Sequence, residues 1–191
     1  MKKLLLFITV LAFFCTKANA QDLKLSYNSS IIYPGVKIGY EVPIFSKDIE
    51  KVKRSGKKKS FTRERLLSVN AAIYHHENYH DNLYVTAGIS FRKTKPGGFF
   101  CEFSPELGVS RTFINGTTYA FDEKNAMKIE KSNGYFYPLL SVGGGFGYDF
   151  SKTKDLPFAT FTKLNMIALY PYNSGFYFRP TFELGISYKI K

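Results

Sequence analysis

The stretch FYFRPTFELGISYKIK, residues 176–191, alternates in side-chain character from one residue to the next. Its even-numbered positions are all apolar, and its odd-numbered positions are nearly all polar or small. A two-residue period of this length predicts a β-strand with one apolar and one polar face. Strands of soluble proteins usually span about five or six residues, whereas about ten tilted residues cross a bilayer. We therefore interpret this stretch as the closing strand of a membrane barrel.

The beginning of the chain has the three parts of a secretory signal peptide. Lys2 and Lys3 supply positive charge, residues 4–15 form an apolar run too short to span a membrane, and residues 18–20 (Ala-Asn-Ala) fit a small-residue cleavage site. We expect residues 1–20 to be removed on export.

The expected mature chain, residues 21–191, is basic and rich in Phe and Tyr. Removing Lys2, Lys3 and Lys17 lowers the formal net charge from +12 to +9. Cys101 alone remains, so we expect no intramolecular disulfide despite export. No stretch after residue 20 is apolar enough for a transmembrane helix. A membrane protein of this composition must then be a closed barrel, in which every backbone polar group is satisfied internally.

Alternation and turn signals divide the mature chain into eight strands after a polar lead-in. Residues 21–30 are polar, and we expect them to be a periplasmic segment with limited pairing. The strands are predicted at residues 32–45, 61–74, 82–92, 99–113, 117–121, 136–150, 158–169 and 176–191. The predicted fold is an all-β, eight-stranded antiparallel up-and-down transmembrane β-barrel that follows a cleaved signal peptide and forms one outer-membrane domain.

An even number of strands places both termini on one side, which we take as the periplasm. The connections expected outside the cell are residues 46–60, 93–98, 122–134 and 170–175. Those expected in the periplasm are residues 75–81, 114–116 and 151–156. Tyrosines near strand ends are candidates for aromatic girdles at the membrane surfaces: Tyr33, Tyr74, Tyr135, Tyr170, Tyr172 and Tyr177.

The closing FELGISYKIK, together with the signal peptide and the alternating strands, resembles the small outer-membrane barrels of the OmpA/OmpX type. The glycine-rich segments GGGFGYDF and ELGISY resemble uncharacterised outer-membrane barrels of Bacteroidetes. The resemblance covers the mature chain as a pattern and includes no catalytic motif. It implies a porin-like protein in the outer membrane of a Gram-negative cell envelope. One departure is that Tyr188 is followed by Lys189-Ile190-Lys191, whereas the family usually ends in an aromatic residue.

The polar face of the strands carries nine ionisable residues that would point into a barrel lumen. They are Lys37, Glu41, Arg92, Glu102, Glu106, Asp149, Lys163, Arg179 and Glu183. An eight-stranded barrel is filled by its own side chains, and charges inside it must be paired or hydrated. We expect a salt-bridged plug. The alternative is a gate or narrow ion path that opens when a pair such as Arg179–Glu183 breaks.

The connection at residues 46–60 is strongly basic. Its cations are Lys47, Lys51, Lys53, Arg54, Lys57, Lys58 and Lys59, against Asp48 and Glu50. Such a run is typical of a solvated loop. The functional alternative is contact with anionic lipid head groups or another anionic surface ligand. An exported barrel is not expected to bind nucleic acid.

All three histidines, His75, His76 and His80, lie in one short segment. Residues 76–80 match the zinc-protease pattern HExxH, which requires a helix to bring both histidines to one metal. The flanks have strand periodicity and Asn78 favours a turn, so we expect a polar turn, with metal chelation at a hairpin end as the alternative. We predict no catalytic residue and no cofactor.

These features predict a non-enzymatic, monomeric outer-membrane barrel that is structural or binds partners through extracellular loops, in contact with membrane lipid. Three alternatives remain open. They are an outer-membrane lipid-modifying enzyme, a narrow ion channel, and a soluble periplasmic ligand-binding barrel whose apolar face would point inward.

Overall fold

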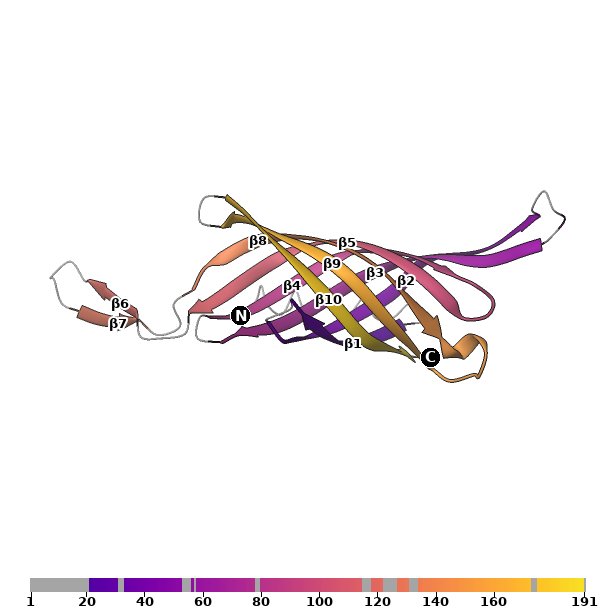
Figure 1. Ribbon diagram of the computed structural model, residues 1–191, viewed down its shortest axis with the longest axis horizontal. Helices are drawn as coiled ribbons and strands as arrows, with labels where there is room; N and C mark the ends of the chain where they lie inside the picture. The colour runs from indigo at the N-terminus through magenta and orange to yellow at the C-terminus, as the bar shows by residue number, and fades with distance from the viewer. Residues whose placement is uncertain are drawn as a thin grey trace, which may run out of the picture.

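Eight antiparallel strands close into a barrel in the order β1-β10-β9-β8-β5-β4-β3-β2 (Figure 1). Their bounds are β1 (Gln21–Ser29), β2 (Gly35–Val52), β3 (Lys58–His76), β4 (His80–Thr94), β5 (Phe99–Ile114), β8 (Phe136–Asp149), β9 (Phe158–Tyr172) and β10 (Gly175–Ile190). Each barrel strand pairs with the next one along the chain, and β1 pairs with β10 to complete the ring. The predicted all-β, eight-stranded up-and-down fold is confirmed.

This computed structural model describes residues 21–30, 33–52, 56, 58–77, 80–114, 118–121, 127–130, 134–172 and 175–190. The predicted signal peptide lies outside the described residues, as do Lys53, Arg54 and Lys57 of the basic connection. A short 3-10 helix, η1 (Phe150–Lys152), follows β8. Within the described ranges, no helix is long and apolar enough to cross a membrane.

The first strand corrects the prediction of a loosely paired lead-in at residues 21–30. β1 pairs with β10 from Gln21↔Ile190 to Ser29↔Phe182, and it pairs with β2 along its other edge. Its outward residues Leu23, Leu25 and Tyr27 are exposed, and its inward residues Lys24, Ser26 and Asn28 are buried. The alternation of this nine-residue strand rests on only three outward apolar residues, which is too short a run to stand out from a polar segment.

The predicted fifth strand, residues 117–121, was also wrong as a barrel strand. Thr118–Phe121 is β6, which pairs with β7 (Met127–Glu130) in a separate two-stranded sheet beyond one end of the barrel (Figure 1). β5 instead pairs directly with β8, from Phe99↔Tyr148 to Arg111↔Phe136. A four-residue strand is too short to match the barrel strands on either side.

One strand missed and one strand added leave the predicted number of strands at eight. The connections between these two positions, however, lie at the opposite end of the barrel from the one predicted. We call the end where Gln21 pairs with Ile190 the terminal end, and the opposite end the distal end. The β2–β3 and β4–β5 connections lie at the terminal end, whereas the β3–β4 connection and β6–β7 lie at the distal end. The predicted sides of residues 46–60, 75–81, 93–98 and 114–116 were therefore reversed relative to the termini.

The two faces of the barrel wall differ sharply in chemistry. On β4, the outward Leu83, Val85 and Ile89 are 42%, 49% and 38% exposed, whereas the inward Asn82 and Thr86 are each 1% exposed. Inward glycines make room for the polar lining. A Cβ built on Gly143 would lie 2.0 Å from Asn165 Oδ1, so a larger residue there would displace the asparagine.

The β2–β3 hairpin extends past the rest of the barrel at the terminal end (Figure 1). β1 flanks β2 from Val36 to Glu41, while β2 and β3 remain paired out to Val52↔Lys58. A β-bulge between Pro43 and Phe45 marks the beginning of this extension. Bulges of this kind bend and twist the strand that carries them.

The pairing of β1 with β10 predicts that two cysteines introduced opposite each other on these strands form a disulfide. Leu25 and Ile186 lie directly opposite and outward, so Leu25→Cys with Ile186→Cys, in a Cys101→Ser background, should cross-link on mild oxidation. Mass spectrometry of the digested protein would detect the linked peptide. Leu25→Cys with Phe182→Cys, about 13 Å out of register, should stay reduced. Equal cross-linking of both pairs would contradict this register.

Candidate functional site

The lumen holds a network of buried ionisable side chains. The nine residues placed on the polar face by the sequence are all 9% exposed or less: Lys37, Glu41, Arg92, Glu102, Glu106, Asp149, Lys163, Arg179 and Glu183. Lys24, on β1, is 4% exposed and joins them. Lys24 was not among the predicted lumen residues, because residues 21–30 were not expected to form a barrel strand, although the alternation Leu23, Leu25, Tyr27 is a signal for one.

Glu102, on β5, has three ion-pair partners, more than any other carboxylate of the described residues. Its carboxylate accepts hydrogen bonds from Lys24 Nζ at 3.2 Å, from Arg92 Nε at 2.9 Å and from Lys163 Nζ. The Ser104 hydroxyl donates a fourth bond at 3.0 Å. Because a buried carboxylate is costly unless it is paired and hydrogen-bonded, this coordination keeps Glu102 ionised inside the barrel.

Two further carboxylates complete the group, which we call the Glu102 cluster. Glu41 accepts from Lys24 Nζ at 2.5 Å and from Arg92 Nη2 at 2.6 Å, and Asp22 accepts from Arg92 Nη1 at 3.1 Å. The cluster therefore consists of three carboxylates and three cations, drawn from five strands: Asp22, Lys24, Glu41, Arg92, Glu102 and Lys163. Its formal charges cancel.

A second group, the Lys37 cluster, consists of Lys37, Glu106 and Glu183. Lys37 Nζ lies 3.6 Å from Glu106 Oε1 and 3.4 Å from Glu183 Oε2. Neutral donors satisfy the remaining carboxylate oxygens: the Thr86 hydroxyl bonds Glu106 at 2.7 Å, and the Ser26 hydroxyl bonds Glu183 at 2.8 Å. One lysine thus serves two carboxylates with the help of hydroxyl groups.

Two of the nine predicted residues lie outside both clusters. Asp149 pairs with Lys189 at 2.5 Å at the terminal end of the barrel. Arg179 does not pair with Glu183, and that predicted pair was wrong, because four residues along one strand separate side chains by about 13 Å. The Arg179 guanidinium instead lies over the Tyr74 ring, 3.6 Å from its centroid, in a cation–π contact.

Tyrosines fill the distal end of the lumen. Tyr74 and Tyr84 are buried, and Tyr33, Tyr137, Tyr172 and Tyr177 pack against their cluster. Four of the tyrosines proposed as girdle residues therefore belong to this internal cap: Tyr33, Tyr74, Tyr172 and Tyr177. Tyr74 points inward because it shares a face of β3 with the buried Ala72. Only Tyr135 and Tyr170 of the six are largely exposed, at 57% and 50%.

The histidines lie at the distal end, on paired strands. His76 is directly opposite His80, with ring centroids 5.1 Å apart, and His75 Nδ1 lies 2.6 Å from Asp81 Oδ1. The helix that an HExxH zinc site requires is therefore replaced by a hairpin. Among the described residues, no group of three or more His, Cys, Asp and Glu side chains is arranged to hold a metal ion.

The described part of the basic connection forms the far end of the β2–β3 extension. Lys51 pairs with Lys59 and Val52 pairs with Lys58, and the three lysines are exposed. They lie at the terminal end of the barrel, whereas the histidines lie at the distal end.

No family model and no curated protein matches the chain. Among solved structures, the N-terminal β-barrel domain of Pseudomonas aeruginosa OprF is 14% identical, with 91% of this chain and 98% of that chain covered and a TM-score of 0.47. Ail, the attachment invasion locus protein of Yersinia pestis, is 10% identical (90% and 95% covered, TM-score 0.44). Neisserial surface protein A is 10% identical (90% and 94% covered, TM-score 0.43).

Likenesses at this level carry no inference about function, and the fold is established by the strand pairing of the chain itself. The resemblance to Bacteroidetes barrels gains no support from these matches.

The Glu102 cluster predicts a large effect of one substitution. Glu102→Gln leaves Lys24, Arg92 and Lys163 with a buried excess of positive charge, so we expect the free energy of unfolding to fall by about 3–5 kcal/mol. Urea unfolding of the protein folded in detergent or lipid would measure it. Glu50→Gln, on the exposed β2–β3 extension, removes the same charge and should change the free energy by less than about 0.5 kcal/mol. Similar losses in both variants would contradict the cluster's role.

The distal end predicts a pH effect at His80, which lies at the beginning of β4. Burial lowers the pKa of His80, and the neighbouring His76 and Arg179 lower it further. Unfolded histidine titrates near pH 6.5, so the unfolded chain binds more protons just below that pH. The stability contributed by neutral His80 is therefore present above about pH 6.5 and is lost as the pH falls toward the lower pKa of the folded state.

NMR titration of the histidine ring protons would measure this pKa. The His80 resonance, assigned by its absence in His80→Gln, should have its midpoint below pH 6.5. A midpoint at or above that value would show that the distal end does not bury this ring.

Proposed function

We propose that the chain is a non-enzymatic integral outer-membrane barrel whose lumen is closed by its own side chains. The observation that carries this proposal is the inverted distribution of side chains. Large aliphatic and aromatic residues cover the outside of every barrel strand, while charged and polar residues are buried within. Exposed apolar surface on this scale marks contact with a membrane or a partner.

The height of the apolar surface fits a bilayer. On β4 the outward residues from Leu83 to Phe91 are all apolar. At about 3.4 Å per residue and a tilt of about 40°, this segment spans roughly 20 Å along the barrel axis. The apolar band of outer-membrane barrels is about 25 Å tall and flanked by aromatic residues.

Exposed aromatic residues gather at both limits of this band. At the terminal end, Phe91 stacks with Phe103 at a centroid distance of 6.5 Å. At the distal end, Tyr170 stacks with Phe176 at 4.5 Å. Aromatic rings are enriched at the two membrane–water interfaces, so their positions support a spanning orientation.

The interior supports a closed barrel. The Glu102 cluster occupies the lumen toward the terminal end, the Lys37 cluster lies in the middle, and the tyrosine cap occupies the distal end. A soluble barrel that binds an apolar ligand would need a mainly apolar lumen, whereas the buried Phe100 and Phe161 lie under the cations Lys24, Arg92 and Lys163. We therefore favour a structural role, or recognition through the distal connections, over transport or ligand storage.

The sidedness follows from the lengths of the connections. The longest connection joins the distal ends of β5 and β8 and contains β6 and β7. Because extracellular loops are longer than periplasmic turns in this class, we place the distal end outside the cell. The basic β2–β3 extension then lies in the periplasm, opposite to the side expected from the sequence. We propose a monomer, since the sheet closes within one chain.

Membrane insertion and lumen closure are tested together on purified protein. The folded barrel should remain in membranes after carbonate extraction, migrate differently before and after boiling in detergent gels, and give no steady conductance in planar bilayers. Solubility without detergent would contradict the membrane assignment. A steady, ion-selective conductance would contradict the closed lumen and favour the narrow channel.

The non-enzymatic assignment has its own assay. The reconstituted protein should release no acyl chains from phospholipid or lipopolysaccharide. Activity that disappears when His75, His76 or His80 is replaced would favour a lipid-modifying enzyme.

A further inference from the structure

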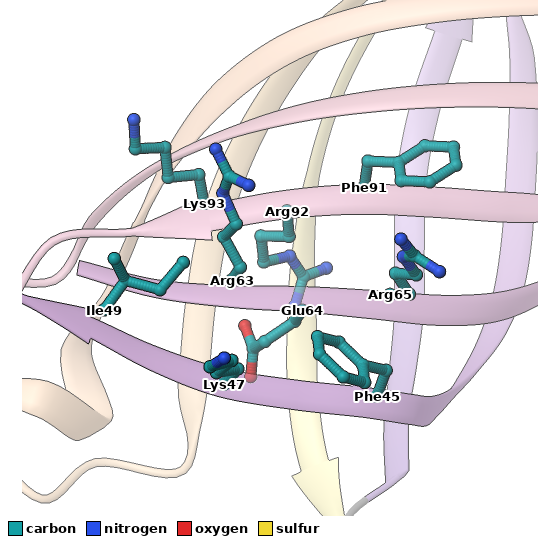
Figure 2. A pocket seen from close by; sticks show the side chains of 9 residues that line it. All are labelled: Phe45, Lys47, Ile49, Arg63, Glu64, Arg65, Phe91, Arg92 and Lys93. Atoms are coloured by element: carbon teal, nitrogen blue, oxygen red, sulfur yellow. The ribbon is translucent and has the colours of Figure 1, made fainter.

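Two cross-strand rows lie side by side on the outer face of β2, β3 and β4 at the terminal end. The phenylalanine row consists of Phe45, Arg65 and Phe91, and the cationic row consists of Lys47, Arg63 and Lys93. Within each row the residues lie directly opposite one another, so their side chains share one face. Figure 2 shows how these side chains lie on the three strands.

The two rows line a hollow of about 420 Å³ (Figure 2). Ile49, Glu64 and Arg92 complete its lining. Arg92 is already bonded to Asp22, Glu41 and Glu102 inside the barrel. Glu64, the one carboxylate of the lining, accepts a hydrogen bond from Thr94 at 3.4 Å. The four outward cations of the two rows therefore exceed the negative charge available to them.

Aromatic rings hold these cations in place. Lys93 Nζ lies 4.1 Å from the centroid of the Phe61 ring, and the Arg65 guanidinium lies 5.4 Å from that of Phe45. Cation–π contacts of this kind fix the direction of a charge without neutralising it. Like charges directly opposite on neighbouring strands destabilise a sheet. An anion bound between them would relieve that repulsion.

The rows lie at a specific depth on the proposed membrane surface. Toward the middle of the barrel, the next outward residues are Leu67 and Ile89, which are aliphatic and exposed. The phenylalanine row follows them, and the cationic row comes directly after. This order matches the passage from acyl chains through the interface to the phosphate groups of a lipid leaflet.

We propose that the cationic row binds the phosphate of an anionic glycerophospholipid in the leaflet at the terminal end, with the acyl chains against Leu67, Ile89 and the phenylalanine row. The inference rests on the proposed function and names its lipid partner. Lipopolysaccharide is not the expected ligand, because the hollow lies at the end opposite the proposed extracellular side.

Lipid retention measured by native mass spectrometry tests this site. Protein in detergent would be mixed with phosphatidylglycerol, phosphatidylcholine or lipopolysaccharide, and the lipid retained per barrel would be counted. The variant Lys47→Gln/Arg63→Gln/Lys93→Gln removes the cationic row. The matched control Lys51→Gln/Lys58→Gln/Lys59→Gln removes three cations from the far end of the same extension.

We expect wild type and control to retain phosphatidylglycerol in preference to phosphatidylcholine, and the cationic-row variant to bind it about tenfold or more weakly. Added salt should weaken the wild-type binding. The single variants Lys47→Gln and Lys93→Gln should give intermediate losses, and they keep the test valid if the triple variant folds poorly.

Equal binding by the triple variant and the control would overturn the site and leave a solvated basic face. Preference for lipopolysaccharide, or no preference for phosphatidylglycerol over phosphatidylcholine, would overturn the choice of lipid. These results are separable from a failure of the proposed function, because carbonate extraction and heat-dependent migration report membrane insertion independently.

Discussion

Closure of the sheet by the pairing of β1 with β10 is the constraint on which the other features depend. A wall covered with exposed leucine, valine and phenylalanine has no water at its surface in the proposed setting, so an unpaired strand edge there would leave backbone groups without partners. The pairing from Gln21↔Ile190 to Ser29↔Phe182 removes that edge. It also places Lys24 of β1 so that its ammonium group donates a hydrogen bond across the lumen to Glu102 of β5.

The interior is divided into two chemically different parts. Toward the terminal end, the three carboxylates and three cations of the Glu102 cluster are matched, and farther from that end Lys37 is shared between two carboxylates. At the distal end, tyrosine rings pack around Arg179, whose charge meets aromatic faces in place of a carboxylate. The lumen is narrow enough that glycines such as Gly143 must face the bulkier asparagines.

The sequence predicted the strands whose alternation was obvious and the side chains that follow from parity. Residues 176–190 were correctly predicted as the closing strand because their apolar residues recur at every second position without interruption. Residues 21–30 were misassigned because only three apolar residues mark their short alternation, and residues 117–121 were misassigned because a short hairpin has the same local signals as a barrel strand. The partners of the buried charged side chains could not be predicted, since they depend on how the strands are aligned in the closed barrel. Arg179 and Glu183 share a face and a strand, yet only the closed ring shows that, across the lumen, Arg179 meets Tyr74 of β3 and Glu183 meets Lys37 of β2.

The composition of the Glu102 cluster also constrains how the barrel assembles. Its six members come from β1, β2, β4, β5 and β9, so its first and last contributors, Asp22 and Lys163, are far apart along the chain. A single strand entering hydrocarbon alone would carry an unmatched charge, such as Lys24 or Glu102, into a medium that solvates neither. The matching charges become available only when distant strands arrive together. Insertion and ring formation are therefore coupled steps, and contacts of such high sequence separation make that concerted step slow.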